Sequence, residues 1–151
     1  MINSAKIADI SWMVGLSHEK RAAYEKIQPN FWKMAENSNE IQAKWFEEEL
    51  KNPKVIALTC ENNLGFIIGK LVNPPEVYSA GLTLMIDDFC VKSPELWGNI
   101  GKKLLEKCIE MGKFAGAEQI LVVCGKHDRA KYNLLESMEL STASVWCTRK
   151  I

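Results

Sequence analysis

The chain has 151 residues, 47% of them hydrophobic and 25% charged, a composition typical of a single globular domain covering residues 1–151. Its 19 basic and 19 acidic residues cancel, so net charge gives no reason to expect binding to nucleic acid or to an anionic membrane. No apolar run approaches the ~20 residues of a membrane-spanning helix, and the N-terminus lacks the apolar core of a secretory signal, so we expect a cytoplasmic protein.

The cysteines occur singly, at Cys60, Cys90, Cys108, Cys124 and Cys147. No two of them form a CxxC pair, and all but Cys147 lie in apolar runs. The two histidines are too few, and too far from the cysteines in sequence, to indicate a metal cluster. We therefore expect reduced thiols in the core, with neither a disulfide nor a bound metal.

The N-terminal part of the chain predicts one strand and two helices. Ile7–Met13 alternates imperfectly between apolar and polar residues, as a first strand would. Ser17–Ile27 is rich in helix-forming residues and stops before a proline. Asn37 and Glu40 have the spacing of a capping box, and the apolar residues that follow at helical spacing predict an amphipathic helix ending near Pro53.

Three antiparallel strands are predicted next. Val55–Cys60 and Leu64–Val72 flank a short polar turn, which is typical of a β-hairpin. A third strand begins at Leu82 and carries the adjacent carboxylates Asp87 and Asp88. Because a buried charge is costly unless it is paired, solvated or neutralised, we expect this strand to be splayed toward a cleft.

The C-terminal part predicts a βαβ unit followed by a helix and a last strand. Gly101–Phe114 has an apolar stripe at helical spacing, and Ile120–Cys124 is a wholly apolar strand reached by a right-handed crossover. His127–Met138 predicts a further helix, and Ser144–Arg149 a final strand. The fold class expected is therefore α/β, with a mixed sheet of about six to seven strands, an antiparallel N-terminal half and four helices.

The segment Trp97–Lys103 lies where the carboxylate-bearing strand turns into a helix. Gly98 and Gly101 would let the backbone approach a ligand closely, and free N–H groups at a helix N-terminus attract phosphate oxygens. The same residues also fit a plain turn. Neither GxxxxGK[ST] nor GxGxxG is present, so the two common nucleotide-binding motifs are not supported.

Two segments of this region match the pattern of a known family. Ile86–Val91 is similar to a fourth-strand pattern of the type LEDLFV, and Gly101–Leu105 is similar to a helix start of the type G-x-x-L-L. With the order of elements, they make the chain resemble the Gcn5-related N-acetyltransferase family. The family's loop motif [Q/R]xxGx[G/A] aligns with Leu96, Asn99 and Gly101, so two of its three specified positions differ.

The resemblance continues into the last helix with further departures. Family members often carry N-x-x-A-x-x-x-Y-x-x-x-G-F there, and the matching positions are Asp128, Lys131, Leu135, Glu139 and Leu140. The usual tyrosine is thus replaced by leucine. Tyr132 lies three residues earlier, about one helical turn away.

The resemblance implies that acetyl-CoA donates an acetyl group to a primary amine of a small molecule or peptide. Asp87 stands where the family has a catalytic glutamate, so it is the candidate base, and Tyr132 is a candidate acid for the departing thiolate. The resemblance also implies that backbone N–H groups of the strand bind the pantetheine arm. The expected cofactor-binding residues are Phe89, Cys90, Val91, Trp97, Gly98, Asn99, Ile100, Gly101, Lys102, Lys103, His127 and Asp128.

Each candidate also has an ordinary structural interpretation. Asp87 or Asp88 could form a structural ion pair, and the two side chains should point to opposite faces unless a bulge intervenes. Tyr132 could be a helix-face aromatic and His127 a surface residue.

The sequence also leaves the function and the assembly open. A non-catalytic CoA-binding or protein-interaction module with the same fold is the alternative function. The acceptor amine has no recognisable signature. A homodimer is compatible with the sequence.

Overall fold

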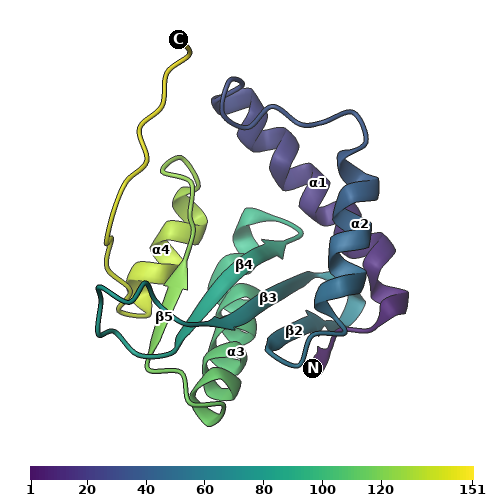
Figure 1. Cartoon of the computed structure of the whole chain (residues 1–151). Coiled ribbons are helices and arrows are strands. Elements are labelled where there is room, and N and C mark those ends of the chain that lie inside the picture. Colours follow the sequence, from purple (N-terminus) through teal and green to yellow (C-terminus); the bar gives the residue numbers. More distant parts are fainter.

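A computed structural model describes residues 1–151 (Figure 1). A five-stranded sheet in the order β1-β2-β3-β4-β5 forms its centre. The strands are β1 (Ile2–Ser4), β2 (Val55–Cys60), β3 (Gly65–Val72), β4 (Thr83–Val91) and β5 (Gln119–Val122). The α-helices are α1 (Ile10–Ile27), α2 (Ser38–Glu49), α3 (Lys102–Phe114) and α4 (Arg129–Ser137).

The direction of the strands divides the sheet into two parts. Strands β1 to β4 are antiparallel to their neighbours, whereas β5 pairs parallel to β4 after the crossover through α3. This confirms the predicted mixed sheet, with its antiparallel N-terminal half and C-terminal βαβ unit. The number of strands is five and not six to seven, because the segment expected to form the last strand is not in the sheet.

Two predicted strands are wrong. Ile7–Met13 forms a short 3-10 turn and the start of α1, because Ile10, Met13 and Val14 lie at helical spacing and bury one face. The first strand is instead Ile2–Ser4, which pairs with the end of β2. Ser144–Arg149 has strand-forming side chains but pairs with no strand, and it lies exposed in the extended C-terminal segment at the left of Figure 1.

The other predicted elements are confirmed with shifted ends. The hairpin of β2 and β3 is present, as are the helices around Gly101–Phe114 and His127–Met138. Helix α1 is longer than predicted because it begins at Ile10. Helix α2 begins after Asn37, but the Asn37 side chain makes no capping hydrogen bond, so the predicted capping box does not form.

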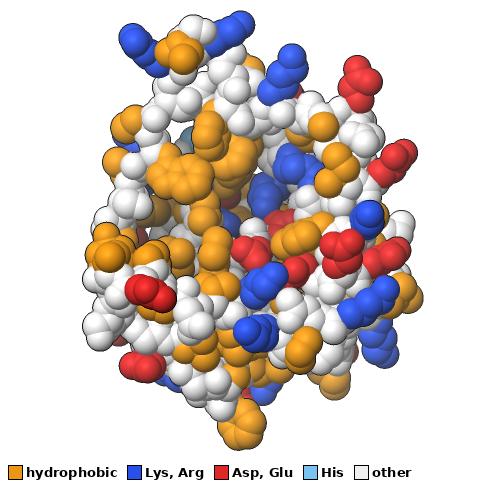
Figure 2. All heavy atoms as spheres, in the orientation of Figure 1, with side chains coloured by type: hydrophobic (Ala, Val, Ile, Leu, Met, Phe, Trp, Pro, Cys, Tyr) orange, Lys and Arg blue, Asp and Glu red, His pale blue; other side chains and the backbone are white.

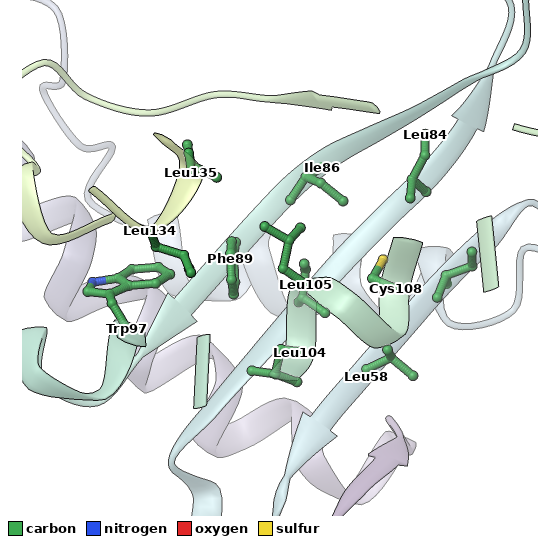
Figure 3. Packing of buried hydrophobic residues seen from close by; sticks show 12 residues of the cluster. Leu58, Leu84, Ile86, Phe89, Trp97, Leu104, Leu105, Cys108, Leu134 and Leu135 are labelled. Carbon is green, nitrogen blue, oxygen red and sulfur yellow. The ribbon is translucent and has the colours of Figure 1, made fainter. Parts of the chain in front are cut away.

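Helices cover both faces of the sheet, and each face has its own core. Helices α1 and α2 pack on one face, where Met13, Phe46 and Phe66 are fully buried. Helices α3 and α4 pack on the other. Figure 3 shows this second core, in which Trp97 lies beside Phe89 of β4 and Leu134 of α4. Because apolar side chains alternate between the two cores, β4 is buried on both faces along much of its length.

The cysteines are distributed between core and surface. Cys60, Cys90 and Cys108 are buried, Cys124 is half-buried and Cys147 is exposed, all as free thiols. Burial raises the pKa of the Cys108 thiol to about 12, so this thiol stays protonated at neutral pH. None of the helices combines the length and the apolar character needed to cross a lipid bilayer.

Candidate active site

The central strand β4 contains a β-bulge at Asp87. Ile86 pairs with Gly69 of β3 and Asp88 pairs with Ile68, so Asp87 has no partner on β3. One extra residue reverses the alternation of side chains that follow it. As a result Ile86 and Phe89, three residues apart, lie in the same core.

The bulge also brings both carboxylates to the face covered by α1 and α2. Asp88 contacts Ser17 and Lys20 of α1, and Asp87 lies within the electrostatic influence of Glu49 and Lys70. Adjacent aspartates were expected to point to opposite faces unless a bulge intervened, and the bulge is present.

The environment of Asp87 shifts the pKa of its carboxyl group. Its side chain is exposed, but the protein around it removes part of its water, and this desolvation together with the charge of Glu49 raises the pKa of Asp87. Lys70 opposes the shift, although its ammonium is engaged 2.8 Å from the Glu49 carboxylate. A carboxylate with a raised pKa is a stronger base than an ordinary aspartate.

Asp88 is the structural member of the pair. It is buried and accepts hydrogen bonds from Ser17 Oγ at 2.8 Å, from the Lys20 ammonium and from the Cys90 thiol. Burial alone would raise the pKa of Asp88, but the charge of Lys20 and these hydrogen bonds outweigh it and lower the pKa. The same ion pair raises the pKa of Lys20 despite the opposing effect of burial. Asp88 therefore stays ionised and tied to α1.

Strands β4 and β5 separate just beyond the bulge. The last parallel pair is Ile86 with Val122, whereas β4 continues to Val91 in pairing with β3 alone. The β5 side of β4 therefore presents unpaired backbone groups over Asp87–Val91. Figure 2 shows that this face of the molecule is hollowed between α1 and α4, with acidic and basic side chains inside the hollow.

The segment Trp97–Lys103 is helical and not an open loop. Pro94–Leu96 forms a 3-10 turn, Trp97–Gly101 a π-helical turn, and α3 continues from there. Trp97 is buried against Phe89, with ring centroids 4.8 Å apart. A Cβ on Gly101 would meet the Trp97 ring at 2.7 Å, so glycine at this position is explained by packing.

Several residues of this turn do reach solvent. Gly98, Asn99, Lys102 and Lys103 are exposed, whereas Ile100 packs partly on the core. A Cβ on Gly98 would meet no atom within 4 Å, which leaves room for a ligand to approach. The exposed part of the segment is thus a smaller candidate phosphate site than the sequence predicted.

On the other side of the hollow, the start of α4 is fixed to α1. The Asp128 carboxylate caps α4 by accepting from the Lys131 backbone N–H, and it accepts from the Tyr24 hydroxyl at 3.1 Å. His127 packs edge-on against the Tyr24 ring, with centroids 4.5 Å apart. The Tyr132 hydroxyl instead bonds to Thr142 Oγ1 at 2.9 Å on an exposed surface.

Comparison with solved structures identifies the fold. A tetramutant of the BH1408 protein from Bacillus halodurans superposes with a TM-score of 0.85 at 18% identity, with 100% of this chain and 99% of that one covered. A predicted acetyltransferase with acetyl-CoA from Clostridium acetobutylicum superposes with a TM-score of 0.70 at 20% identity, covering 99% and 96%. The aminoglycoside N-acetyltransferase AAC(6')-Iy in complex with CoA gives 0.69 at 11% identity, covering 100% and 99%. The chain has the Gcn5-related N-acetyltransferase fold. No family model matches the sequence, and no curated protein matches it.

Within this acetyltransferase fold, the candidate residues differ in their position relative to the opening between β4 and β5. Asp87 and the backbone of Phe89–Val91 lie on β4 beyond its last pair with β5, and His127 and Asp128 follow the end of β5 at the start of α4. The side chains of Phe89, Cys90 and Trp97 lie in the cores, so only their backbone groups are available to a ligand. Tyr132 points its hydroxyl toward the C-terminal segment.

Sequence reasoning missed four polar residues that line this region: Ser17, Lys20, Tyr24 and Lys131. Ser17, Lys20 and Tyr24 continue the inward stripe of α1 begun by Met13, at spacings of three or four residues. The sequence signal for these three residues was their polar character at inward positions of an otherwise apolar helical stripe. For Lys131, the signal was a lysine at a position where the family has alanine.

A groove lies elsewhere on the molecule. About 680 Å³ in volume, it is lined by residues of β2, β3 and the end of α3, including Val55, Leu71 and Phe114. Its lining contains no residue of β4 and neither of the paired aspartates. We assign the candidate site to the β4–β5 opening because Asp87, a carboxylate with a raised pKa, lies where the two strands separate.

Proposed function

We propose that the protein is an N-acetyltransferase that moves the acetyl group of acetyl-CoA to a primary amine. The observation that carries this proposal is the separation of β4 from β5 beyond Ile86, which leaves the backbone of Asp87–Val91 unpaired on one side. Pantetheine contains amide groups, and amides pair well with such a free strand edge. The solved structures that share the fold and were determined with acetyl-CoA or CoA support the same donor.

The site would hold the donor along β4 and at two helix starts. We assign the pantetheine arm to the backbone of Phe89–Val91 and the phosphates to the exposed turn containing Gly98, Asn99 and Lys103. His127 and Asp128 would border the donor from the α4 side. These assignments follow from the unpaired edge of β4 and from the exposure of the turn.

Asp87 is the proposed base. An alkylammonium is protonated at neutral pH, so its proton must leave before the nitrogen can attack the thioester carbonyl. Asp87 accepts this proton directly or through a water molecule, the C–N bond forms, and the C–S bond breaks. The thiolate of CoA then takes a proton from an acid, for which Tyr132 stays the candidate, or from solvent.

Calorimetric titration with acetyl-CoA tests the donor, and CoA release in the presence of an amine panel tests turnover. Released CoA should be quantified by mass spectrometry, because the exposed Cys147 would react with thiol reagents. Absence of acetyl-CoA binding at millimolar concentration would contradict the proposal. Binding with unchanged turnover in Asp87→Asn would contradict the base alone, and unchanged turnover in Tyr132→Phe would contradict the acid.

A second candidate is a non-catalytic CoA-binding or protein-interaction module. It is favoured by the helical closure of Trp97–Gly101 and by a lysine side chain, Lys131, buried beside the opening. Acetyl-CoA binding without CoA release against any amine would select this candidate.

The acceptor amine, the oligomeric state and the cellular location are each separate proposals. The acceptor would approach from the α1–α2 side, where Asp87 lies near Glu49. A homodimer and a cytoplasmic location are predictions from the sequence. Sedimentation of the purified chain would test the former.

A further inference from the structure

Lys131, in the first turn of α4, sends a long side chain into the protein between β4 and β5. The residue is only 3% exposed. Its ammonium donates to the Val123 carbonyl oxygen at 3.0 Å, just past the end of β5. It also lies over the rings of Phe89 and Trp97, 5.4 and 5.7 Å from their centroids. The side chain therefore reaches from α4 to both sides of the opening.

The surroundings of this ammonium are poor for a cation. No carboxylate lies within ion-pair distance of it, whereas Lys20 has Asp88. Desolvation, and then the positive charge of Lys20, lower the pKa of Lys131, while Cys124, Cys90 and Asp128 act in the opposite direction. A buried ammonium with one hydrogen bond and two aromatic contacts is costly to keep in place. Structural stability alone does not explain a lysine here.

The Lys131 side chain lies where the proposed donor, acetyl-CoA, would bind backbone groups. Beyond Ile86 the backbone groups of β4 and β5 no longer pair with each other. The Val123 carbonyl and the free edge of β4 are therefore the groups that an extended amide-bearing ligand would bind. Lys131 already occupies the Val123 carbonyl. It also contacts the Phe89 ring next to the free edge.

We propose that Lys131 controls access of acetyl-CoA to the opening between β4 and β5. Its methylene chain lies in the path of the pantetheine arm, and its ammonium takes the carbonyl that a pantetheine amide would use. The donor binds when this side chain moves aside. This inference rests on the proposed function, because it assumes that the opening is where the donor binds.

A population argument gives the size of the effect. When a site is open for only a fraction of the time, the apparent Kd is the intrinsic Kd divided by that fraction. If Lys131 blocks the opening for about nine-tenths of the time or more, shortening it lowers the Kd about tenfold or more. Removing a positive charge by itself would instead weaken the binding of an anionic ligand.

The test compares acetyl-CoA titrations of the wild type, Lys131→Ala, Lys131→Met and Lys126→Ala. We expect Lys131→Ala to bind at least about tenfold more tightly. Lys131→Met keeps a long side chain and is expected to stay within about threefold of the wild type. Lys126→Ala removes an exposed charge nearby and is expected not to tighten binding.

The outcomes separate the inference from the function it rests on. Equal Kd values for wild type and Lys131→Ala overturn the inference and leave the acetyltransferase proposal in place. Absence of binding in both overturns the two together. Lys131→Met binding as tightly as Lys131→Ala overturns the claim that the bulk of the side chain fills the path. Thermal unfolding checks each variant, and Lys131→Ser makes the same comparison if Lys131→Ala does not fold.

Discussion

The Tyr24 hydroxyl donates to the Asp128 carboxylate at 3.1 Å and joins α1 to the start of α4 across the hollow. The same oxygen accepts from the Gly125 backbone N–H at 3.3 Å. Residues more than 100 positions apart are thus held together beside the candidate site. Burial, followed by the charge of Asp128, raises the pKa of Tyr24, so its hydroxyl remains a donor at neutral pH.

Tyr24→Phe should lower the free energy of unfolding by about 1 kcal/mol, because a hydrogen bond between partly buried groups is lost. Hydrogen exchange at the Gly125 amide should accelerate. Tyr132→Phe is the matched control, since its hydroxyl bonds to Thr142 on an exposed surface. An equal loss of stability in both variants would contradict a special role for the α1–α4 contact.

Removing the Asp88 carboxylate should be costly because it leaves Lys20 without its partner. We expect Asp88→Leu to lose about 3 kcal/mol and the double variant with Lys20→Met to recover part of that loss. The exposed pair of Lys107 and Glu110 is the control, and Lys107→Met should cost less than about 1 kcal/mol. Urea denaturation measures all of these, and an additive double variant would argue against coupling.

The two pKa shifts of this ion pair predict how stability depends on pH. The Asp88 contribution is present above its ordinary value of 3.8 and is lost as the pH falls through its lowered pKa. The Lys20 contribution is present below 10.5 and is lost as the pH rises through its raised pKa. The difference in unfolding free energy between wild type and the double variant should therefore be largest between these limits. A difference in unfolding free energy that stays constant between about pH 3 and about pH 7 would contradict the predicted contribution of Asp88.

Activity should rise with pH through the pKa of Asp87, which lies above its ordinary value of 3.8. Asp87→Asn should lower kcat about 100-fold or more and remove this acidic limb. Glu49→Gln should move the limb to lower pH, because the charge of Glu49 helps to raise the pKa of Asp87. Glu106→Gln, on the exposed face of α3, should leave the pH profile unchanged. A limb that Glu49→Gln does not move would assign it to another group.

The two glycines of the π-helical turn should respond differently to alanine. Gly101→Ala should cost about 1–3 kcal/mol, since the new methyl group would overlap the buried Trp97 ring. Gly98→Ala has free space around it and should keep or raise stability by about 0.5–1 kcal/mol. If the donor phosphates approach Gly98, the same variant should weaken acetyl-CoA binding. Thermal unfolding and calorimetry together separate the two effects.

Local patterns were sufficient wherever an element's own side chains decide its structure. The apolar run Ile120–Cys124 and the polar turn after Cys60 predicted strand and hairpin correctly, because strand propensity and turn chemistry act over a few residues, although Leu121 and Val123 of this run are exposed. Ile7–Met13 was misassigned because its apolar residues fit both a strand and the first turns of a helix. Ser144–Arg149 has strand propensity, but a strand also needs a pairing partner, which its own residues do not reveal.

The sequence singles out candidate residues for the proposed site but does not give their geometry. Asp87 was found from its sequence position, but its orientation relative to Asp88 depends on the register with β3, which belongs to two strands at once. Lys131 was visible as an unusual residue in the last helix. Only the packing of α4 against Phe89 and Val123 shows where its ammonium lies.

The bulge at Asp87 places the proposed base at the residue where β4 and β5 separate. In a regular strand of the same sequence, Asp87 would pair with Ile68, and every side chain from Asp88 to Val91 would exchange faces. Asp88 would turn away from Lys20, and Phe89 would leave Trp97. The contacts of α1 and of Trp97 with β4 therefore require Asp87 to stay outside the pairing with β3.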